Sequence, residues 1–259
     1  MYAETETEIS QAHLKQVIEC IEGPIVILGG WAVQFLVNEG YREVTGRNYL
    51  GSRDIDLGFY MKGQNVDDTP FAKAYSALVN DLGFRPLSFR LFKEMHAETG
   101  EPLDMETARN LPSHQIFHIY VDMVLDRIPE NFRERFGFTP IDEPLLAHVF
   151  AEEGRHLERE EFGKTIWIPT ADILLAMKVR ALPDRDKEHK RIKDVCDIAA
   201  LTLFGSMPGE EGWLEELIGK EDIDRFKEVL TREDIERASE IIAIEPVAVE
   251  GALTRIGLV

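Results

Sequence analysis

Two acidic residues interrupt an otherwise apolar run, and this feature constrains the fold more than any other in the sequence. Asp54 and Asp56 stand one residue apart, and the apolar residues that follow predict a short β-strand over residues 55–60. Alternate side chains of a strand face the same side, about 6.5 to 7 Å apart. Two like charges on one face of a partly buried strand are costly unless a cation lies between them. The segment therefore predicts a strand whose acidic face binds a divalent metal ion.

The composition is that of a globular protein with a large core. The chain has 259 residues, 44% of them apolar, which suffices for one large domain or two ordinary ones. Its acidic N-terminus does not have the pattern of an export signal. The longest apolar stretch, residues 25–37, falls short of the roughly 20 residues that a membrane span requires. We therefore expect a cytoplasmic protein with no membrane partner, whose Cys20 and Cys196 are reduced and buried.

The net charge of −19 opposes broad binding to a phosphate backbone. A nucleic acid would have to meet a local basic patch on an otherwise acidic molecule. The arginines that could gather into such a patch are Arg42, Arg47, Arg53, Arg85 and Arg90.

The apolar pattern divides the chain into a mixed α/β half up to about residue 165 and a helical half beyond it. In the first half it predicts helices at 9–22, 31–38, 71–82 and 144–151, and strands at 25–28, 55–60, 84–91, 115–125 and 165–168. Gly40 is expected to end the second helix, and 41–48 and 95–112 are expected to be loops. The second half begins with a helix after Thr170, a good N-cap, and continues with helices at 186–204, 210–219, 222–230 and 232–243.

Three segments of the first half carry the chemistry. Gly29 and Gly30 lie between a strand and a helix, where backbone N–H groups can approach a phosphate and the helix N-terminus adds partial positive charge. A later strand carries Asp122, with Asp126 on the same strand face as a competing candidate. Carboxylates on two neighbouring strands can hold two Mg²⁺ ions that neutralise charge on a transferring phosphoryl group. The pattern is the outline of a nucleotidyl-transfer site.

The segments ILGGWAVQFL, SRDIDLGF and IYVDMVLD together resemble the nucleotidyltransferases of the DNA polymerase β superfamily. The first of them, with Gly-Gly-Trp-Ala, is similar to the aminoglycoside and lincosamide adenylyltransferases. Residues 169–201, PTADILLAMKVRALPDRDKEHKRIKDVCDIAAL, look more like the AbiEii-type toxins of abortive-infection and toxin–antitoxin systems. The resemblance covers roughly residues 25–204.

This resemblance implies an α/β fold with a mixed sheet flanked by helices, in a catalytic domain of residues 1–165. A helical domain, residues 166–259, would close the nucleotide cleft. Asp54 and Asp56 would bind two Mg²⁺ ions, or Mn²⁺ in their place, with Asp122 as third ligand or as the base that deprotonates the acceptor. The implied nucleotide-binding residues are Gly29, Gly30, Ser52, Arg53, Lys178, which contacts the phosphates, and Asp194, which lies near the nucleotide or the acceptor.

The implied reaction moves a nucleoside monophosphate from an NTP to an acceptor hydroxyl. An AbiEii-like toxin acting on tRNA or protein, with a cognate antitoxin, is the first expectation. An antibiotic-type small-molecule adenylyltransferase is the second, and a catalytically silent nucleotide-binding module is the alternative from another class.

The sequence departs from the family pattern in two places. The interval from Gly30 to Asp54 is long, and Leu50 stands where the family usually has an arginine, so Arg47 or Arg53 would have to compensate. Nucleotide affinity depends on that compensation, whereas the metal site does not.

Ordinary structural roles compete with some of these assignments. Lys178 could be a surface lysine of an apolar helix, and Asp194 and Asp197 could pair with lysines one helical turn away. Two other patterns are attributed to chance. The Arg-x₄-His string at 109–114 contains Pro112, and the zinc pair that His114 and His118 could form has no third ligand nearby.

Overall fold

The structure, a computed structural model, describes residues 4–61 and 69–259 and divides into two compact units. The sheet unit combines the residues up to Trp31 with Gly51–Pro169. The helical unit combines Ala32–Leu50 with Thr170–Val259. The division of function between domains 1–165 and 166–259 stays a prediction.

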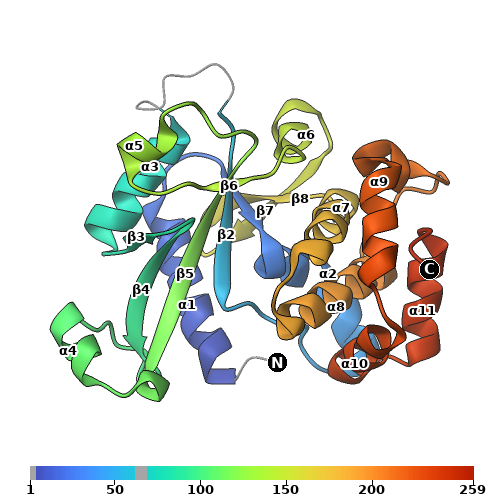
Figure 1. Cartoon of the computed structure of the whole chain (residues 1–259), viewed down its shortest axis with the longest axis horizontal. Coiled ribbons are helices and arrows are strands. Elements are labelled where there is room, and N and C mark those ends of the chain that lie inside the picture. The colour runs from blue at the N-terminus through green and yellow to red at the C-terminus, as the bar shows by residue number, and fades with distance from the viewer. Residues whose placement is uncertain (1–3, 62–68) are drawn as a thin grey trace. The chain divides into compact units, whose positions relative to one another are not determined.

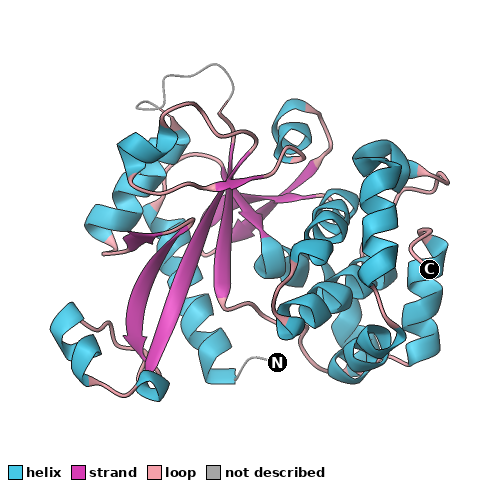
Figure 2. Ribbon diagram, in the orientation of Figure 1, coloured by secondary structure: helices cyan, strands magenta, loops and turns pink. Residues whose placement is uncertain are grey.

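A mixed β-sheet forms the centre of the sheet unit (Figures 1 and 2). Its strands are β1 (Ile25–Leu28), β2 (Asp54–Phe59), β3 (Arg85–Leu87), β4 (Arg90–His96), β5 (Ile116–Leu125), β6 (Ile141–Asp142), β7 (His156–Glu161) and β8 (Lys164–Pro169). The strand order is β3-β4-β5-β2-β1-β8-β7, and β6 pairs with β5. The pairs β2–β5, β1–β8 and β5–β6 are parallel, and the remaining pairs are antiparallel. This mixed sheet confirms the predicted α/β class.

Helices flank the sheet. They are α1 (Glu4–Cys20), α3 (Pro70–Ser76) with the π-helical turn η2 (Ala77–Asp81), α4 (Met105–Asn110), the 3₁₀ turn η3 (Ser113–Gln115), α5 (Phe132–Phe136) and α6 (Leu146–Ala151). Helix α1 contacts both β2 and β5, and the Trp31 indole donates a hydrogen bond to Ser10 of α1 at 3.2 Å. One sheet face is thereby buried, through residues such as Ile55 and Val121. Because side chains alternate along a strand, Asp54, Asp56 and Asp122 belong to the other face.

The helical unit contains most of α2 (Gly29–Thr45) and the helices of the second half. These are α7 (Ala171–Ala181) with the 3₁₀ turn η4 (Leu182–Asp184), α8 (Glu188–Phe204), α9 (Trp213–Val229), α10 (Arg232–Ile242) and α11 (Pro246–Arg255). Helix α8 contacts α7, α10 and α11, and its residues from Ile192 to Thr202 are buried. The Tyr41 hydroxyl of α2 donates to the Ile242 carbonyl at 2.7 Å. The helical region predicted after residue 165 is confirmed.

Several predicted boundaries were wrong. Helix α2 continues through Gly40 to Thr45, because Gly40 faces the Phe204 ring and tertiary packing outweighs its low helix propensity. The strand predicted at 84–91 is a hairpin, β3 and β4, which turns at Ser88 with φ +56°. The region 95–112, predicted as a loop, holds the end of β4 and helix α4. Strand β7 and helix α11 were not predicted.

Two remaining expectations concern cysteines and membranes. Cys196 is buried, as predicted, whereas Cys20 is only half-buried because it ends α1. Within residues 4–61 and 69–259, the structure contains no helix with the length and apolar character that a membrane crossing demands.

Candidate active site

The three acids predicted to bind metal lie together on one face of the sheet. Strands β2 and β5 pair in parallel, with Asp56 opposite Asp122 and Asp54 opposite Tyr120. Neighbouring strands are about 4.8 Å apart, so the backbones of Asp56 and Asp122 lie at that spacing. The Asp122 carboxylate is nearly buried, and Asp54 and Asp56 are partly exposed. The structure thus brings Asp54, Asp56 and Asp122 to one surface, although their metal role stays a prediction.

The diglycine turn touches this acidic surface directly. Strand β1 pairs with β2 so that Leu28 is opposite Asp56, and Gly29 follows immediately with φ +61°. A Cβ built on Gly29 would lie 1.9 Å from Asp56 Oδ2. Gly29 and Gly30 are also the first residues of α2, whose N-terminal N–H groups stabilise negative charge. Glycine is required at position 29 both for its backbone conformation and for the space that the Asp56 carboxylate occupies.

We expect Gly29→Ala to disrupt the carboxylate as well as strain the backbone. The matched control is Gly83→Ala, since Gly83 has φ +73° and a Cβ there would meet nothing within 4 Å. Both variants carry the cost of a left-handed alanine, about 1 kcal/mol. Only Gly29→Ala should also abolish the thermal stabilisation by Mg²⁺ and NTP, measured by differential scanning fluorimetry. Equal responses from both variants would contradict the assigned contact.

Arg90 provides positive charge at the acidic surface. Its guanidinium donates to Asp122 Oδ2 at 2.7 Å and lies 3.9 Å from Asp54 Oδ2. It is also stacked over the Tyr120 ring, with its Cζ 4.5 Å from the ring centroid. Only 13% of the Arg90 side chain is exposed. A fixed cation therefore offsets part of the repulsion among the carboxylates.

Arg90→Met should lower the stability of the metal-free protein and increase its stabilisation by a divalent metal ion. Loss of charged hydrogen bonds at a nearly buried carboxylate costs about 1.5–3 kcal/mol. Mn²⁺ should then raise the melting temperature of Arg90→Met by more than that of the native protein, because carboxylates released from the guanidinium are better metal ligands. Arg85→Met, which removes a guanidinium paired with Glu94 instead, is the control. A smaller Mn²⁺ shift in Arg90→Met than in the control would contradict competition between guanidinium and metal.

Of the other residues predicted to lie around the acids, some contact different parts of the sheet unit. Ser52 is buried just before β2. Arg53 pairs with Glu6 of α1 at 3.5 Å and lies over the buried Phe117 ring, so these two contacts are on the α1 side of the sheet. Asp126, the competitor of Asp122, accepts a hydrogen bond from the Met61 backbone N–H at 2.6 Å. That contact gives Asp126 a structural role at the end of β2, whereas nucleotide binding by Ser52 and Arg53 stays a prediction.

Lys178 and Asp194 belong to the helical unit, where they form a buried ion network. Lys178 Nζ lies 2.6 Å from Asp194 Oδ1 and 2.9 Å from Asp197 Oδ2. Arg185 also pairs with Asp194, at 2.6 Å, and Lys193 pairs with Asp197. The two carboxylates are almost fully buried. Lys178 is therefore not a solvent-exposed surface lysine, and its ammonium group is paired with two carboxylates.

The electrostatics of the network follow from this burial. Burial opposes charge on Lys178, yet Asp194 and Asp197 outweigh it and raise the pKa of the lysine. Burial also opposes charge on Asp197, but Lys178 and Lys193 outweigh it and lower the pKa of that carboxyl. The Tyr49 hydroxyl donates to Asp197 at 2.8 Å, and burial raises the pKa of Tyr49 well above its usual range. Lys178 and Asp197 are therefore both charged at neutral pH.

These pKa shifts predict how stability depends on pH. A carboxyl whose pKa is lower in the folded state stabilises above its unfolded value, about 3.9, and loses that contribution as the pH falls. Lys178, whose pKa is raised, stabilises fully below its unfolded value, about 10.4, and loses that contribution only at higher pH. We expect the urea midpoint to fall between pH 5 and pH 3, and Asp197→Asn to flatten that fall. An equally steep fall in Asp197→Asn would assign the acid sensitivity to other carboxyls.

The acidic surface offers suitable ligands for a hard divalent cation. Within the described residues, no group of three or more acidic, histidine or cysteine side chains is already arranged to hold a metal ion. At this surface the Arg90 guanidinium bonds to Asp122. The carboxylates nonetheless share one sheet face, and the glycine at position 29 leaves room for the oxygen of Asp56. These oxygen donors fit Mg²⁺ or Mn²⁺.

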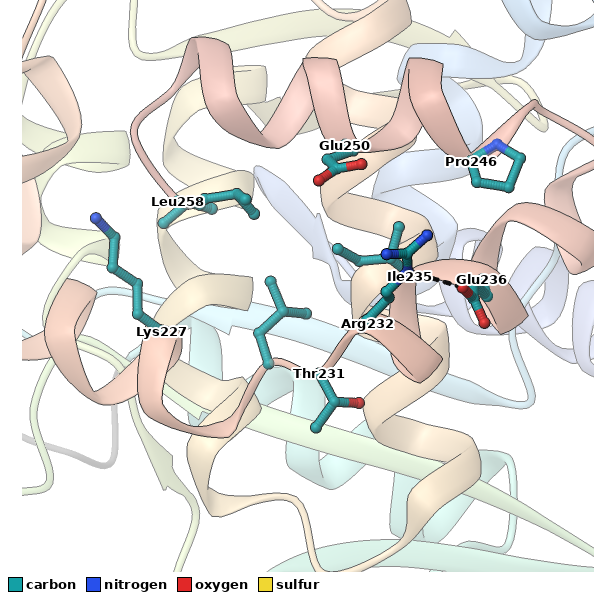
Figure 3. A pocket seen from close by; sticks show the side chains of 10 residues that line it. Lys227, Thr231, Arg232, Ile235, Glu236, Pro246, Glu250 and Leu258 are labelled. Atoms are coloured by element: carbon teal, nitrogen blue, oxygen red, sulfur yellow. Dashed lines mark hydrogen bonds and ion pairs between the residues drawn. The ribbon is translucent and has the colours of Figure 1, made fainter.

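A cavity of about 310 Å³ lies elsewhere, in the helical unit (Figure 3). It is formed by α9, α10, α11 and the C-terminal residues, and its lining contains none of the predicted site residues. Figure 3 shows Arg232 at its rim bound to Glu236, at 3.0 Å. Charged side chains of both signs line it, among them Lys227 and Glu250. The chemistry predicted from the sequence does not involve this cavity.

Comparisons with known proteins add little to this geometry. No protein-family model and no curated protein matches the chain. A crystal structure of an antigenic nucleotidyltransferase-like protein from Paracoccidioides brasiliensis is similar at 12% sequence identity and a TM-score of 0.44. The similarity covers 92% of this chain and 93% of that chain.

Proposed function

We propose that this protein is a divalent-metal-dependent nucleotidyltransferase. The observation that carries the proposal is the pairing of Asp56 with Asp122 across β2 and β5, with Gly29 packed against the Asp56 carboxylate. Acids and a helix-opening diglycine on one surface suit a ligand that combines phosphates with a metal ion. The sequence resemblance to the polymerase β superfamily supports the same reaction.

Each residue then has a defined task. Asp54 and Asp56 would hold Mg²⁺, with Asp122 as third ligand, and the metal would neutralise charge on the triphosphate. Backbone N–H groups at Gly29 and Gly30 would bind phosphate oxygens. In the reaction, the acceptor hydroxyl oxygen forms a bond to the α-phosphorus while the bond to the pyrophosphate oxygen breaks. Pyrophosphate leaves, and where Asp122 acts as the base instead of the third ligand, its carboxylate would take the hydroxyl proton.

Two segments of the sequence bear on the identity of the acceptor. The similarity of residues 169–201 to AbiEii-type toxins supports a tRNA or protein acceptor, and with it a cognate antitoxin as partner. The similarity of the Gly-Gly-Trp-Ala segment to antibiotic adenylyltransferases supports a small-molecule acceptor instead. Lys178 and Asp194 would contribute to nucleotide binding in either case, provided that their ion network opens.

Label transfer tests the proposal. The protein is incubated with Mg²⁺ and each of the four NTPs carrying a radioactive α-phosphate, together with total RNA, cell protein or aminoglycosides in separate reactions. Label in one acceptor class, with release of pyrophosphate, is expected. Absence of label in every class, combined with NTP-dependent thermal stabilisation, would indicate the silent nucleotide-binding module. Absence of both would contradict the proposed function.

A further inference from the structure

A row of rings and guanidinium groups extends from the acids across one face of the sheet. Asp54 of β2 is opposite Tyr120 of β5, Tyr120 is opposite Phe92 of β4, and Phe92 is opposite Arg85 of β3. These strands are neighbours in the sheet, as Figure 1 shows. Three steps of strand spacing carry this row about 14 Å away from Asp54. The row therefore starts at the proposed catalytic surface and leads away from it.

Three neighbouring rings form a surface that we call the aromatic platform: Phe92, His118 and Tyr120. The His118 and Tyr120 rings are stacked, with centroids 6.0 Å apart and an interplanar angle of 11°. The Phe92 ring lies 6.2 Å from His118. All three side chains are partly exposed, and 38% of the His118 side chain is accessible. Nearby Phe89, in the β3–β4 turn, is 44% exposed.

The opposite faces of the same strands show that this exposure is not a general property of the region. Leu91, Ile119 and Val121, which alternate with the platform residues, are fully buried. Exposed aromatic rings at successive alternating positions mark a binding surface more often than a solvated one, because exposing them to water is unfavourable. The platform thus has the character of a recognition surface.

Two arginines border the platform with planar cations. The Arg85 guanidinium carbon lies 4.7 Å from the Phe92 centroid, and that of Arg90 lies 4.5 Å from the Tyr120 centroid. Both arginines are also ion-paired, Arg85 with Glu94 and Arg90 with Asp122. Their charge is therefore partly offset, and they offer flat stacking partners more than free positive charge. On a chain of net charge −19, a ligand held here must be bound mainly by stacking.

We propose that the aromatic platform binds unpaired bases of a single-stranded nucleic acid, whose terminal hydroxyl then points toward Asp122. The proposal rests on the proposed function, because it names the acceptor of that site. Unpaired bases stack on exposed aromatic and guanidinium planes, whereas paired bases cannot reach them. A small aminoglycoside acceptor has no base that could stack on these rings and guanidinium planes.

Fluorescence anisotropy tests this without NTP, so the result does not depend on transfer. The probe is a 5′-fluorescein RNA hexamer with a free 3′-hydroxyl, compared with the same hexamer lacking bases and with the hexamer in a duplex. Phe92→Leu and Tyr120→Leu should each weaken hexamer binding about ten-fold or more. The control is Tyr75→Leu, which removes a half-buried ring of α3 that contacts Phe136 and Phe138. Melting temperatures show whether each variant is folded.

Base stacking and phosphate binding predict different results in this assay. The native protein should bind the hexamer, discriminate against both the abasic hexamer and the duplex, and show a salt slope shallower than about −1.4, the value for two phosphate contacts. The proposal would be overturned if the native protein bound the abasic hexamer as tightly as the normal one. It would also be overturned if Phe92→Leu and Tyr120→Leu were both folded and both bound the hexamer as tightly as the native protein. Label transfer to cell protein alone, with no hexamer binding, would overturn the platform and leave the proposed function intact.

Discussion

Asp56→Asn is expected to lower nucleotidyl transfer by about 10³-fold or more, since a lost metal ligand removes several kcal/mol of charge stabilisation from the transition state. Asparagine keeps the size of the side chain, so the packing against Gly29 should survive. Transfer is measured as release of labelled pyrophosphate under saturating NTP. The fall should appear in the maximal rate and not only in the apparent NTP affinity.

A matched control is available on the same unit. Asp104→Asn removes the same charge from an exposed aspartate that caps α4, where it accepts from the Glu106 and Thr107 N–H groups. Asparagine is an equally good N-cap, so this variant should behave like the native protein. If Asp56→Asn retained more than a tenth of the native rate, the acids of β2 would not be the catalytic centre.

Lys178→Met is expected to destabilise the protein by about 3–5 kcal/mol, because it removes the cation that the two buried carboxylates share. Asp194 and Asp197 are 3% and 0% exposed, so water cannot replace the lysine. Urea denaturation at pH 7 measures the loss. Adding Asp194→Asn to Lys178→Met should recover part of it, since one of the stranded charges is then removed.

The exposed pair of Lys220 and Asp224 supplies the control. Their side chains are 70% and 50% accessible, so Lys220→Met should leave the urea midpoint almost unchanged. A Lys178→Met variant as stable as Lys220→Met would contradict the structural account of the network. It would also favour the alternative that Lys178 is held available for the phosphates of a nucleotide.

Local patterns allowed much of the acidic surface to be predicted. The alternation around Asp54 and Asp56 predicted that they share a strand face, and the structure places them on β2 with Ile55 buried between them. Gly29 and Gly30 were predicted from the change of a strand pattern into a helical one. These features depend on neighbours in the sequence, and local periodicity is therefore sufficient to predict them.

Long-range register could not be predicted in the same way. Arg90 was one of five arginines that might form a rim, and nothing local indicates that β4 places it opposite Asp122. The contact depends on the pairing of strands separated by a helix and a long connection. The platform of Phe92 and Tyr120 was missed for the same reason, since its two rings come from different strands.

Some helix boundaries and buried charges were predicted wrongly, because they depend on tertiary packing that the local sequence does not reveal. Gly40 was expected to end α2, but it faces Phe204 within the helical unit, where packing outweighs its low helix propensity. Asp194 was predicted to lie near the nucleotide or the acceptor, whereas Asp197 was considered only as a partner of a lysine one helical turn away. The structure shows that Asp197 is the more deeply buried and is held by Lys178, Lys193 and Tyr49 from three different segments.

The central claim, that the acids of β2 and β5 bind a divalent metal together with a nucleotide, is tested most directly by counting bound Mn²⁺ with electron paramagnetic resonance. The measurement uses the native protein, Asp54→Asn/Asp56→Asn and Asp104→Asn, each with a non-hydrolysable NTP analogue. We predict that the native protein and Asp104→Asn bind Mn²⁺ in the presence of the analogue and that the double variant does not. Equal Mn²⁺ binding by all three proteins would contradict the claim.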